Sequence, residues 1–174
     1  MIGSSFVVRT ADDETTAAAC VDLWVAAVAD RDGVTASGAV RDRARAKFAA
    51  ERVALVVADD GTAPGVVTGF ALVSAPGTGG GPTAGAASSG TAYLSLLAVA
   101  PGAQGHGLGR RLLAAAVSAA AEAGFAHCEL HALDDNAPAL ALYASAGFHP
   151  VGDPFPHALN GRPTRAWRAD ARVR

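Results

Sequence analysis

The sequence predicts an α/β fold in which a mixed, mostly antiparallel β-sheet is flanked by helices. Short apolar runs rich in β-branched residues alternate with alanine- and leucine-rich runs of helical length. One such helical run separates the apolar runs at 93–99 and 127–133, and a helical crossover of this kind joins parallel strands. The 174 residues, of which 51% are hydrophobic, are enough for one domain with a sizeable core.

The first half of the chain is predicted to contain three strands and two helices. Asp12, Asp13 or Thr15 caps the first helix, which continues to about Asp30 with apolar residues at helical spacing. The runs RVALVVA and VVTGFALVS flank the turn Asp59-Asp60-Gly61 and therefore predict a hairpin. The expected ranges are 6–9, 52–58 and 66–74 for the strands and 39–51 for the second helix.

The second half is predicted to alternate strands and helices. Each of its two helices ends at a glycine, Gly124 or Gly147, which is typical of a helix C-terminus. Prolines then mark a long turn before the last strand. The expected ranges are 107–123 and 136–146 for the helices and 93–99, 127–133, 148–152 and 164–173 for the strands.

Residues 75–90, APGTGGGPTAGAASSG, form a low-complexity stretch without the apolar side chains of a core. We expect a flexible loop here. It should join two strands of one sheet rather than two domains, because the segments on either side are too short to fold alone. Residues 1–174 are therefore assigned to a single domain.

Composition excludes several classes of protein. A formal net charge of -2 argues against a nucleic-acid binder. Cys20 and Cys128 lie in apolar segments without partners at metal-ligand spacing, so we expect two buried free thiols in a reducing compartment. The N-terminal residues lack the pattern of a signal peptide, and no apolar run approaches the ~20 residues of a membrane span. We therefore expect a cytoplasmic protein without membrane contact.

The stretch QGHGLGRR, from Gln104 to Arg111, lies where a predicted strand meets a predicted helix. Its alternate glycines leave backbone N–H groups accessible, and the helix N-terminus adds unpaired N–H groups and partial positive charge. Arginines in a first helical turn oppose that charge, which indicates that an anion offsets it. We interpret the stretch as a phosphate loop, with Arg110 near the anion and Arg111 near it or in solvent. Glycines that serve only a tight turn are the alternative.

Two common phosphate loops do not fit this stretch. Arg-Arg-Leu follows Gly109 where a P-loop needs Lys-Ser/Thr, and no register matches G-x-G-x-x-G. The pattern Q-x-x-G-x-G instead resembles the acyl-coenzyme A signature of the GNAT family of N-acetyltransferases. The preceding LAVAP and the downstream N-x6-Y-x3-G-F element, from Asn136 through Tyr143 to Phe148, also resemble this family in order and spacing.

The resemblance implies the acyl-CoA N-acyltransferase fold, whose mixed sheet has a V-shaped split that holds acetyl-CoA. The backbones of Leu97, Ala98 and Val99 are then expected to bind the pantetheine arm, and an N–H group near Val99 to stabilise the oxyanion. The pyrophosphate is expected on the loop, whose residues are Gln104, Gly105, His106, Gly107, Leu108, Gly109 and Arg110. The side chain of His106 faces either solvent or these phosphates.

Tyr143 lies where the resembled family places the acid that protonates the leaving thiolate, seven residues after Asn136. A core aromatic residue is the alternative for this position. Asn136 itself either anchors the cofactor arm or caps the helix that it precedes.

The general base is predicted from one strand. Positions 95–97 are Ser-Leu-Leu, where many relatives of the resembled family carry a glutamate. His131 stands five residues before Asn136, where some relatives carry an acid, and the pKa of histidine suits a base. Glu129 would orient it, because His127, Glu129 and His131 alternate and share one face of the strand. A solvent-facing polar face and a water relay are alternatives; strand rise disfavours a metal cluster, and we expect no metal.

The chain is therefore predicted to transfer an acetyl group from acetyl-CoA to a primary amine by direct attack in a ternary complex. The acceptor is a small molecule, or the N-terminus or a lysine of a protein. A non-catalytic acyl-CoA-binding or regulatory domain of the same fold is the alternative, favoured by the missing carboxylate and opposed by Tyr143. A homodimer is possible, since the resembled family often dimerises.

Two features of the acceptor site stay open. Acidic residues either favour a cationic acceptor or are solvated surface; they are Asp12, Asp13, Glu14 and Glu51. Trp24 and Trp167 are expected in the core, with an acceptor pocket as the alternative.

Overall fold

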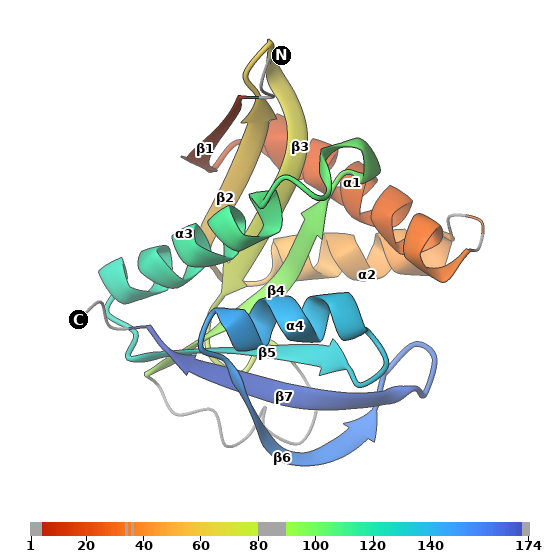
Figure 1. Ribbon diagram of the computed structural model, residues 1–174, viewed down its shortest axis with the longest axis vertical. Helices are drawn as coiled ribbons and strands as arrows, with labels where there is room; N and C mark the ends of the chain where they lie inside the picture. Colours follow the sequence, from red (N-terminus) through yellow and green to blue (C-terminus); the bar gives the residue numbers. More distant parts are fainter. Residues whose placement is uncertain (1–4, 34, 36, 80–89, 172–174) are drawn as a thin grey trace.

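A computed structural model describes residues 5–33, 35, 37–79 and 90–171 of the chain (Figure 1). In this part of the chain seven strands form one sheet in the order β1-β2-β3-β4-β5-β7-β6. Neighbouring strands are antiparallel except β4 and β5, which are parallel. The predicted sheet is therefore confirmed. The strands are β1 (Phe6–Ala11), β2 (Arg52–Asp60), β3 (Ala63–Ser74), β4 (Thr91–Val99), β5 (His127–Leu133), β6 (His149–Pro156) and β7 (Pro163–Asp170).

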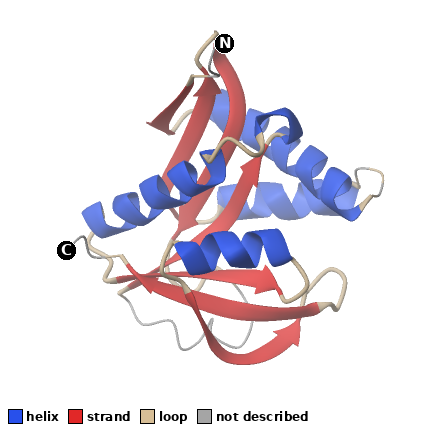
Figure 2. Ribbon diagram, viewed as in Figure 1, coloured by secondary structure: helices blue, strands red, loops and turns tan. Residues whose placement is uncertain are grey.

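Helices cover both faces of the sheet (Figure 2). They are α1 (Glu14–Asp32), α2 (Gly38–Ala49), α3 (Leu108–Glu122) and α4 (Ala137–Ser145). One core lies under α3 and is closed by side chains of α4, with Leu112 and Leu113 fully buried. The second core lies under α1 and α2, with Phe70 and Leu72 fully buried. Burial on both faces explains why the central strands are continuous apolar runs in the sequence.

The sheet opens at its only parallel step among the described strands. β4 and β5 pair only through Thr91, Ala92 and Tyr93 on β4. Beyond that point the strands diverge, as Figure 1 shows, and the parts of β4 and β5 that follow line the two sides of a V. This divergence is the split that the resemblance implied.

The element order matches the prediction, and most boundaries move by one to three residues. Asp59 and Asp60 end β2 instead of forming a turn, because the buried Asp59 carboxylate pairs with Arg9 of β1 at 2.6 Å. β6 continues past Gly152 to Pro156. Proline is tolerated there because β6 is the last strand of the sheet and has a free edge.

Three further expectations concern the chain as a whole. Cys20 and Cys128 are free and buried, as predicted. Most of the expected loop at 75–90, namely residues 80–89, lies outside the described residues, as do residues 172–174 of the expected last strand. Within the described part of the chain, no helix has the length and apolar character needed to cross a membrane.

Candidate active site

The split exposes backbone groups of β4. In an antiparallel pair, the N–H and C=O of successive residues point alternately toward the partner strand and away from it. The N–H of Ala100 donates to the carbonyl of Thr68 in β3 at 2.8 Å. This bond shows which residues of β4 point toward β3. Ala98 therefore also faces β3, whereas the N–H and C=O of Leu97 and Val99 face the split. Ala98 was one of three residues whose backbone was predicted to bind the pantetheine arm. Its N–H and C=O groups instead pair with β3.

The glycine loop after β4 has the backbone of an anion site. Gly105 and Gly107 have φ angles of 79° and 73°, a left-handed conformation that strains other residues. Gly107 precedes α3, and no side chain caps this helix. The N–H of Arg111 makes the first helical bond, to the carbonyl of Gly107 at 3.2 Å. The N–H groups before it in the first turn therefore have no intrahelical acceptor.

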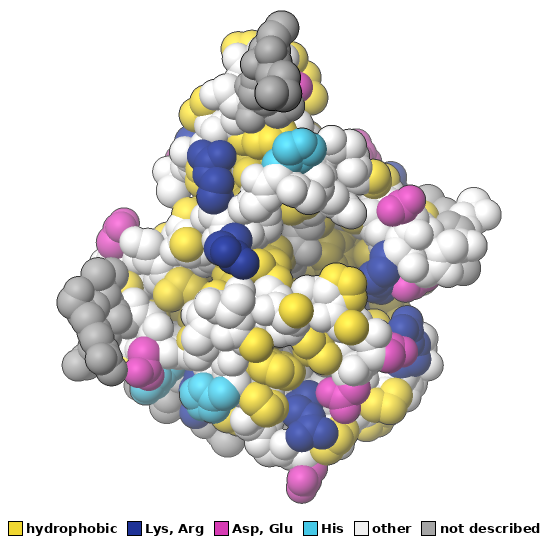
Figure 3. Space-filling view, in the orientation of Figure 1, with side chains coloured by type: hydrophobic (Ala, Val, Ile, Leu, Met, Phe, Trp, Pro, Cys, Tyr) yellow, Lys and Arg dark blue, Asp and Glu magenta, His cyan; other side chains and the backbone are white. Residues whose placement is uncertain are grey.

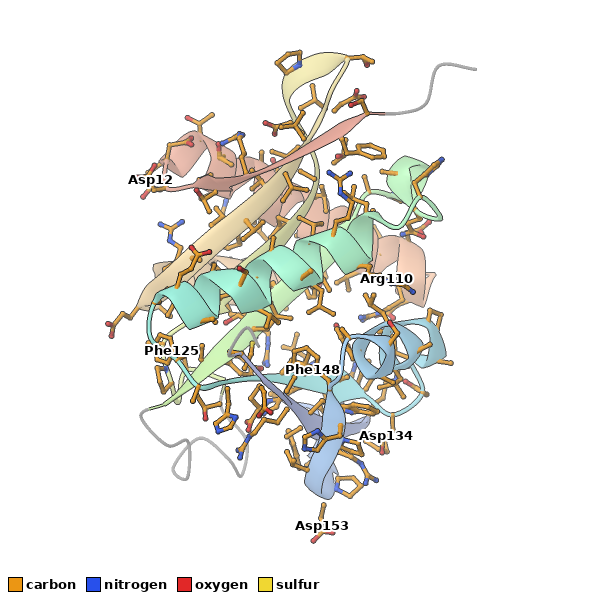
Figure 4. All side chains as sticks on the ribbon, turned by 60° about the vertical axis from the view of Figure 1, so that its left-hand side comes forward. Asp12, Arg110, Phe125, Asp134, Phe148 and Asp153 are labelled. Carbon is orange, nitrogen blue, oxygen red and sulfur yellow. The ribbon has the colours of Figure 1, made fainter. Side chains whose placement is uncertain are left out.

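The first turn of α3 faces α4 across the open end of the split. A Cβ on Gly109 would lie 3.5 Å from Leu142 of α4 and 3.8 Å from Val99 of β4. Arg110, on the same turn, lies at the side of α3 that faces α4 (Figure 4). The surface is hollowed in this region, with hydrophobic side chains in the hollow and basic side chains beside it (Figure 3).

The other polar residues of the loop make contacts within the protein. Arg111 donates from Nη2 to the carbonyl of Phe6 at 3.0 Å and so ties α3 to β1. The exposed ring of His106 packs edge-to-face on Phe6 at 6.1 Å. Gln104 donates from Nε2 to the carbonyl of Val99 at 3.3 Å, which holds the loop against the end of β4.

Tyr143 lies on α4, half-buried against the apolar cluster that contains Leu97 and Val99. Burial raises the pKa of Tyr143 to about 12, and the charge of Arg31 opposes the shift. The phenol therefore keeps its proton at neutral pH. Burial also raises the pKa of Tyr93.

Asn136 caps α4, with its Oδ1 accepting from the N–H of Ala139 at 3.4 Å. The capping alternative for this residue is therefore confirmed. The cap orients α4 so that Tyr143, two turns later, packs beside the split.

Glu129 and His131 are buried on the face of β5 opposite α3 and α4. Glu129 is 4% exposed, and the His131 side chain is 10% exposed. His131 Nε2 lies 3.5 Å from a Glu129 carboxylate oxygen, and Arg168 donates to the other oxygen at 2.8 Å. The ring of His131 is 5.0 Å from the rings of both Tyr93 and Phe155. The alternative of a solvent-facing polar face is wrong for these two residues, because aromatic side chains cover them.

Two functional candidates were missed by the sequence analysis, Lys47 and Tyr93. Lys47 Nζ lies 5.4 Å from the centroid of the Tyr93 ring and donates to the carbonyl of Ser95 at 3.1 Å. Ser95 stands at an irregularity in β4, where its hydroxyl lies 2.6 Å from that of Ser74. The available signal was that Lys47 is the only lysine of the chain.

Other candidates lie away from the split. Asp12 is at the start of α1 (Figure 4), and Asp13 caps that helix by accepting from Thr16 N–H at 2.8 Å. A helix of 19 residues is about 28 Å long, so the end of α1 near the split is remote from these acids. Trp24 and Trp167 pack against the two cores, as expected.

Comparison with known proteins agrees with this geometry. The model of the acetyltransferase (GNAT) family matches residues 9–148 of the chain. The chain belongs to the GNAT family. A mycothiol acetyltransferase of Beutenbergia cavernae is 43% identical to this GNAT protein over 73 residues. That match covers 42% of this chain and 24% of the relative, so the chain spans about a quarter of that protein's length.

Solved structures share the fold of this GNAT protein over almost its whole length. The ribosomal-protein-S18-alanine N-acetyltransferase of Escherichia coli superposes with a TM-score of 0.70 at 19% identity, covering 98% of this chain and 96% of that one. The Salmonella typhimurium protein yncA, solved with its cofactor acetyl-CoA, has a TM-score of 0.67 at 21% identity and the same coverage. The predicted acyl-CoA N-acyltransferase fold is therefore confirmed.

Proposed function

We propose that this GNAT chain acts as a single-domain N-acetyltransferase that transfers the acetyl group of acetyl-CoA to a primary amine within a ternary complex. The observation that carries the proposal is the open edge of β4. The peptide groups of Leu97 and Val99 face the split immediately before the uncapped N-terminus of α3. Membership of the acetyltransferase family supports acyl transfer as the reaction.

The described residues fit acetyl-CoA. A pantetheine arm can pair with Leu97 and Val99 as an additional strand would, which needs no particular side chain. The diphosphate fits the free N–H groups of Leu108, Gly109 and Arg110 at the positive end of α3. When bound there, acetyl-CoA supplies an activated thioester. The absence of a side chain at Gly109 lets the first turn of α3 pack close to Leu142 of α4 and Val99 of β4.

Two groups of the protein can then stabilise the developing negative charge and protonate the leaving sulfur. The N–H of Val99 would donate to the carbonyl oxygen as negative charge develops on it, as in an oxyanion hole. Tyr143 would donate its phenolic proton toward the sulfur as the thiolate leaves. Because burial raises the pKa of Tyr143 to about 12, that proton is present throughout the neutral range.

The amine must lose a proton, because a lysine-like amine with a pKa near ~10.4 is almost fully protonated at pH 7. We propose His131 as the acceptor of this proton. Glu129 lies 3.5 Å from its Nε2 and stabilises the imidazolium that forms, while Arg168 holds the Glu129 carboxylate in place. This pair replaces the carboxylate that β4 lacks at 95–97.

Calorimetry and an acceptor screen test the proposed function. Purified protein is titrated with CoA and then incubated with acetyl-CoA and a panel of primary amines, while free thiol is measured. We expect heat from CoA and thiol release with at least one amine. If the titration with CoA produces no heat of binding, the proposed function is wrong.

A His131→Gln variant tests the base. We expect kcat to fall by about ten- to a hundredfold near pH 7, since general bases contribute at least this much. The affinity for CoA should not change, because His131 lies on the opposite face of the sheet from α3. A loss that disappears at pH 9–10, where more of the amine is already neutral, identifies proton removal. A loss independent of pH contradicts the role.

A non-catalytic acyl-CoA-binding domain is the second candidate. The observation that favours it is the absence of a carboxylate at 95–97 of β4. Heat from CoA together with no thiol release from any amine would support this candidate over the enzyme.

A further inference from the structure

Lys47 lies against β4 on the face of the sheet that carries His131, where we place the acceptor, and its charge is poorly solvated. It is half-buried on α2, and its Nζ donates to the carbonyl of Ser95 at 3.1 Å above the ring of Tyr93. Burial lowers the pKa of Lys47 to about 8, and the charge of Arg43 acts in the same direction. An ammonium group in such a place is costly unless a counter-ion accompanies it.

Further basic side chains act on the same region as Lys47. Burial lowers the pKa of His157, which follows β6, and the charges of Arg43, Arg31 and Lys47 lower it further. Arg43 and Lys47 lie four residues apart on α2, which places them one above the other on the same face of that helix. Within the described residues, neither Lys47 nor Arg43 forms an ion pair with a carboxylate.

The carboxylates on this side are paired with arginines. Asp32 lies 2.8 Å from Arg31 and 3.7 Å from Arg162. Glu129 accepts from Arg168 at 2.8 Å. The counter-ion of Lys47 is therefore not supplied by these residues.

We infer that Lys47 binds a carboxylate carried by the acceptor, so that the substrate is an amine of the amino-acid class. This inference rests on the proposed acetyltransferase function. An ammonium group has three N–H donors; one is used by the Ser95 carbonyl, and two remain for the two oxygens of a carboxylate. The same charge would disfavour protonation of the nearby amine, which assists its attack.

Lys47 and His131 both lie beside the ring of Tyr93. Lys47 Nζ is 5.4 Å and the His131 ring 5.0 Å from the Tyr93 centroid. We therefore place the carboxylate of the acceptor at Lys47 and its amine toward His131. The charge of Lys47 favours an acceptor that carries a carboxylate over one that is cationic alone.

Matched acceptors test the inference by thiol release from acetyl-CoA. α-Amino acids are compared with the carboxamides that have the same side chains, and we expect kcat/KM to favour the acids by at least about tenfold. Lys47→Gln should lose about 10- to 100-fold on the acids and less than about threefold on the amides. Arg45→Gln, an exposed change on the same helix, should alter neither. Equal rates on acids and amides, or equal losses in Lys47→Gln, overturn the inference.

A binding measurement separates this inference from the proposed function. Because the chain has one lysine, 15N-lysine labelling yields a single side-chain signal whose titration reports the pKa of Lys47. Glutarate should raise that pKa above its value of about 8, because a bound carboxylate favours the charged amine, and glutaramide should leave it unchanged. An unmoved pKa overturns the carboxylate site even if acetyl transfer occurs. A raised pKa without thiol release from any amine supports the carboxylate site and contradicts the acetyltransferase.

Discussion

Replacing Tyr143 with phenylalanine should lower kcat by about 10²- to 10⁴-fold, the range that general acids contribute. The substitution removes only the hydroxyl group, so the ring should keep its packing against Phe148. Without that proton the thiolate must leave as an unprotonated anion in an apolar environment. Single-turnover measurements with saturating acetyl-CoA would report the loss in the chemical step.

The chain contains two tyrosines, which provides a matched control for this variant. Tyr93→Phe removes the same atom on the opposite face of the sheet, beside His131, and should change kcat by less than about tenfold. Calorimetry should show that both variants bind CoA like the wild type. Wild-type turnover in Tyr143→Phe would remove Tyr143 as the acid, whereas lost CoA affinity would assign it a packing role.

Gly109→Asp should raise the Kd for CoA by about 10²- to 10³-fold, because like charges at a binding interface cost several kcal/mol. The new carboxylate would lie at the start of α3, where we place the diphosphate. The same change should stabilise the fold by about 0.5–1.5 kcal/mol, since a helical glycine is replaced and a negative charge meets the positive end of the helix. An added Cβ makes only ordinary contacts with Leu142 and Val99.

The opposite signs of these two effects make the Gly109 test specific. Gly38→Asp, at the first position of α2, is the matched control because an added Cβ there meets no atom within 4 Å. It should stabilise the fold by a similar amount and leave the affinity for CoA unchanged. Thermal unfolding and calorimetry on the two variants give both quantities. Unchanged CoA affinity in Gly109→Asp would show that the diphosphate lies elsewhere.

The glycine loop and the helix that carries Tyr143 were predictable because their determinants are local in the chain. Gly105 and Gly107 adopt left-handed conformations within one loop, and Tyr143 follows its helix cap by two turns. Such features depend on neighbouring residues and therefore leave a pattern that can be read along the sequence. The orientation of Ala98 left no such pattern, because it depends on which residue of β3 lies opposite Ala98 in the sheet.

The acceptor side was not predictable in the same way. Lys47 and Tyr93 lie 46 positions apart, and no spacing rule relates a helix to a strand that is separated from it by two other strands. His131 and Glu129 were chosen from the strand alternation, but their burial under Tyr93 and Phe155 was not foreseen. Arg111 was considered for phosphate or solvent, and it instead bonds a carbonyl 105 positions away in β1.

The sequence alone thus determined the order of strands and helices, the glycine loop at which we propose that phosphate binds, and the family resemblance. Turn chemistry, periodicity and motif spacing are properties of short segments. Only the tertiary structure decided which charges meet across the split. The carboxylates near the start of α1 are carried away from the site by the length of that helix, and the single lysine is brought onto β4 by the packing of α2. Long-range electrostatics depends on distances through space, and these exist only after the sheet and its helices have packed together.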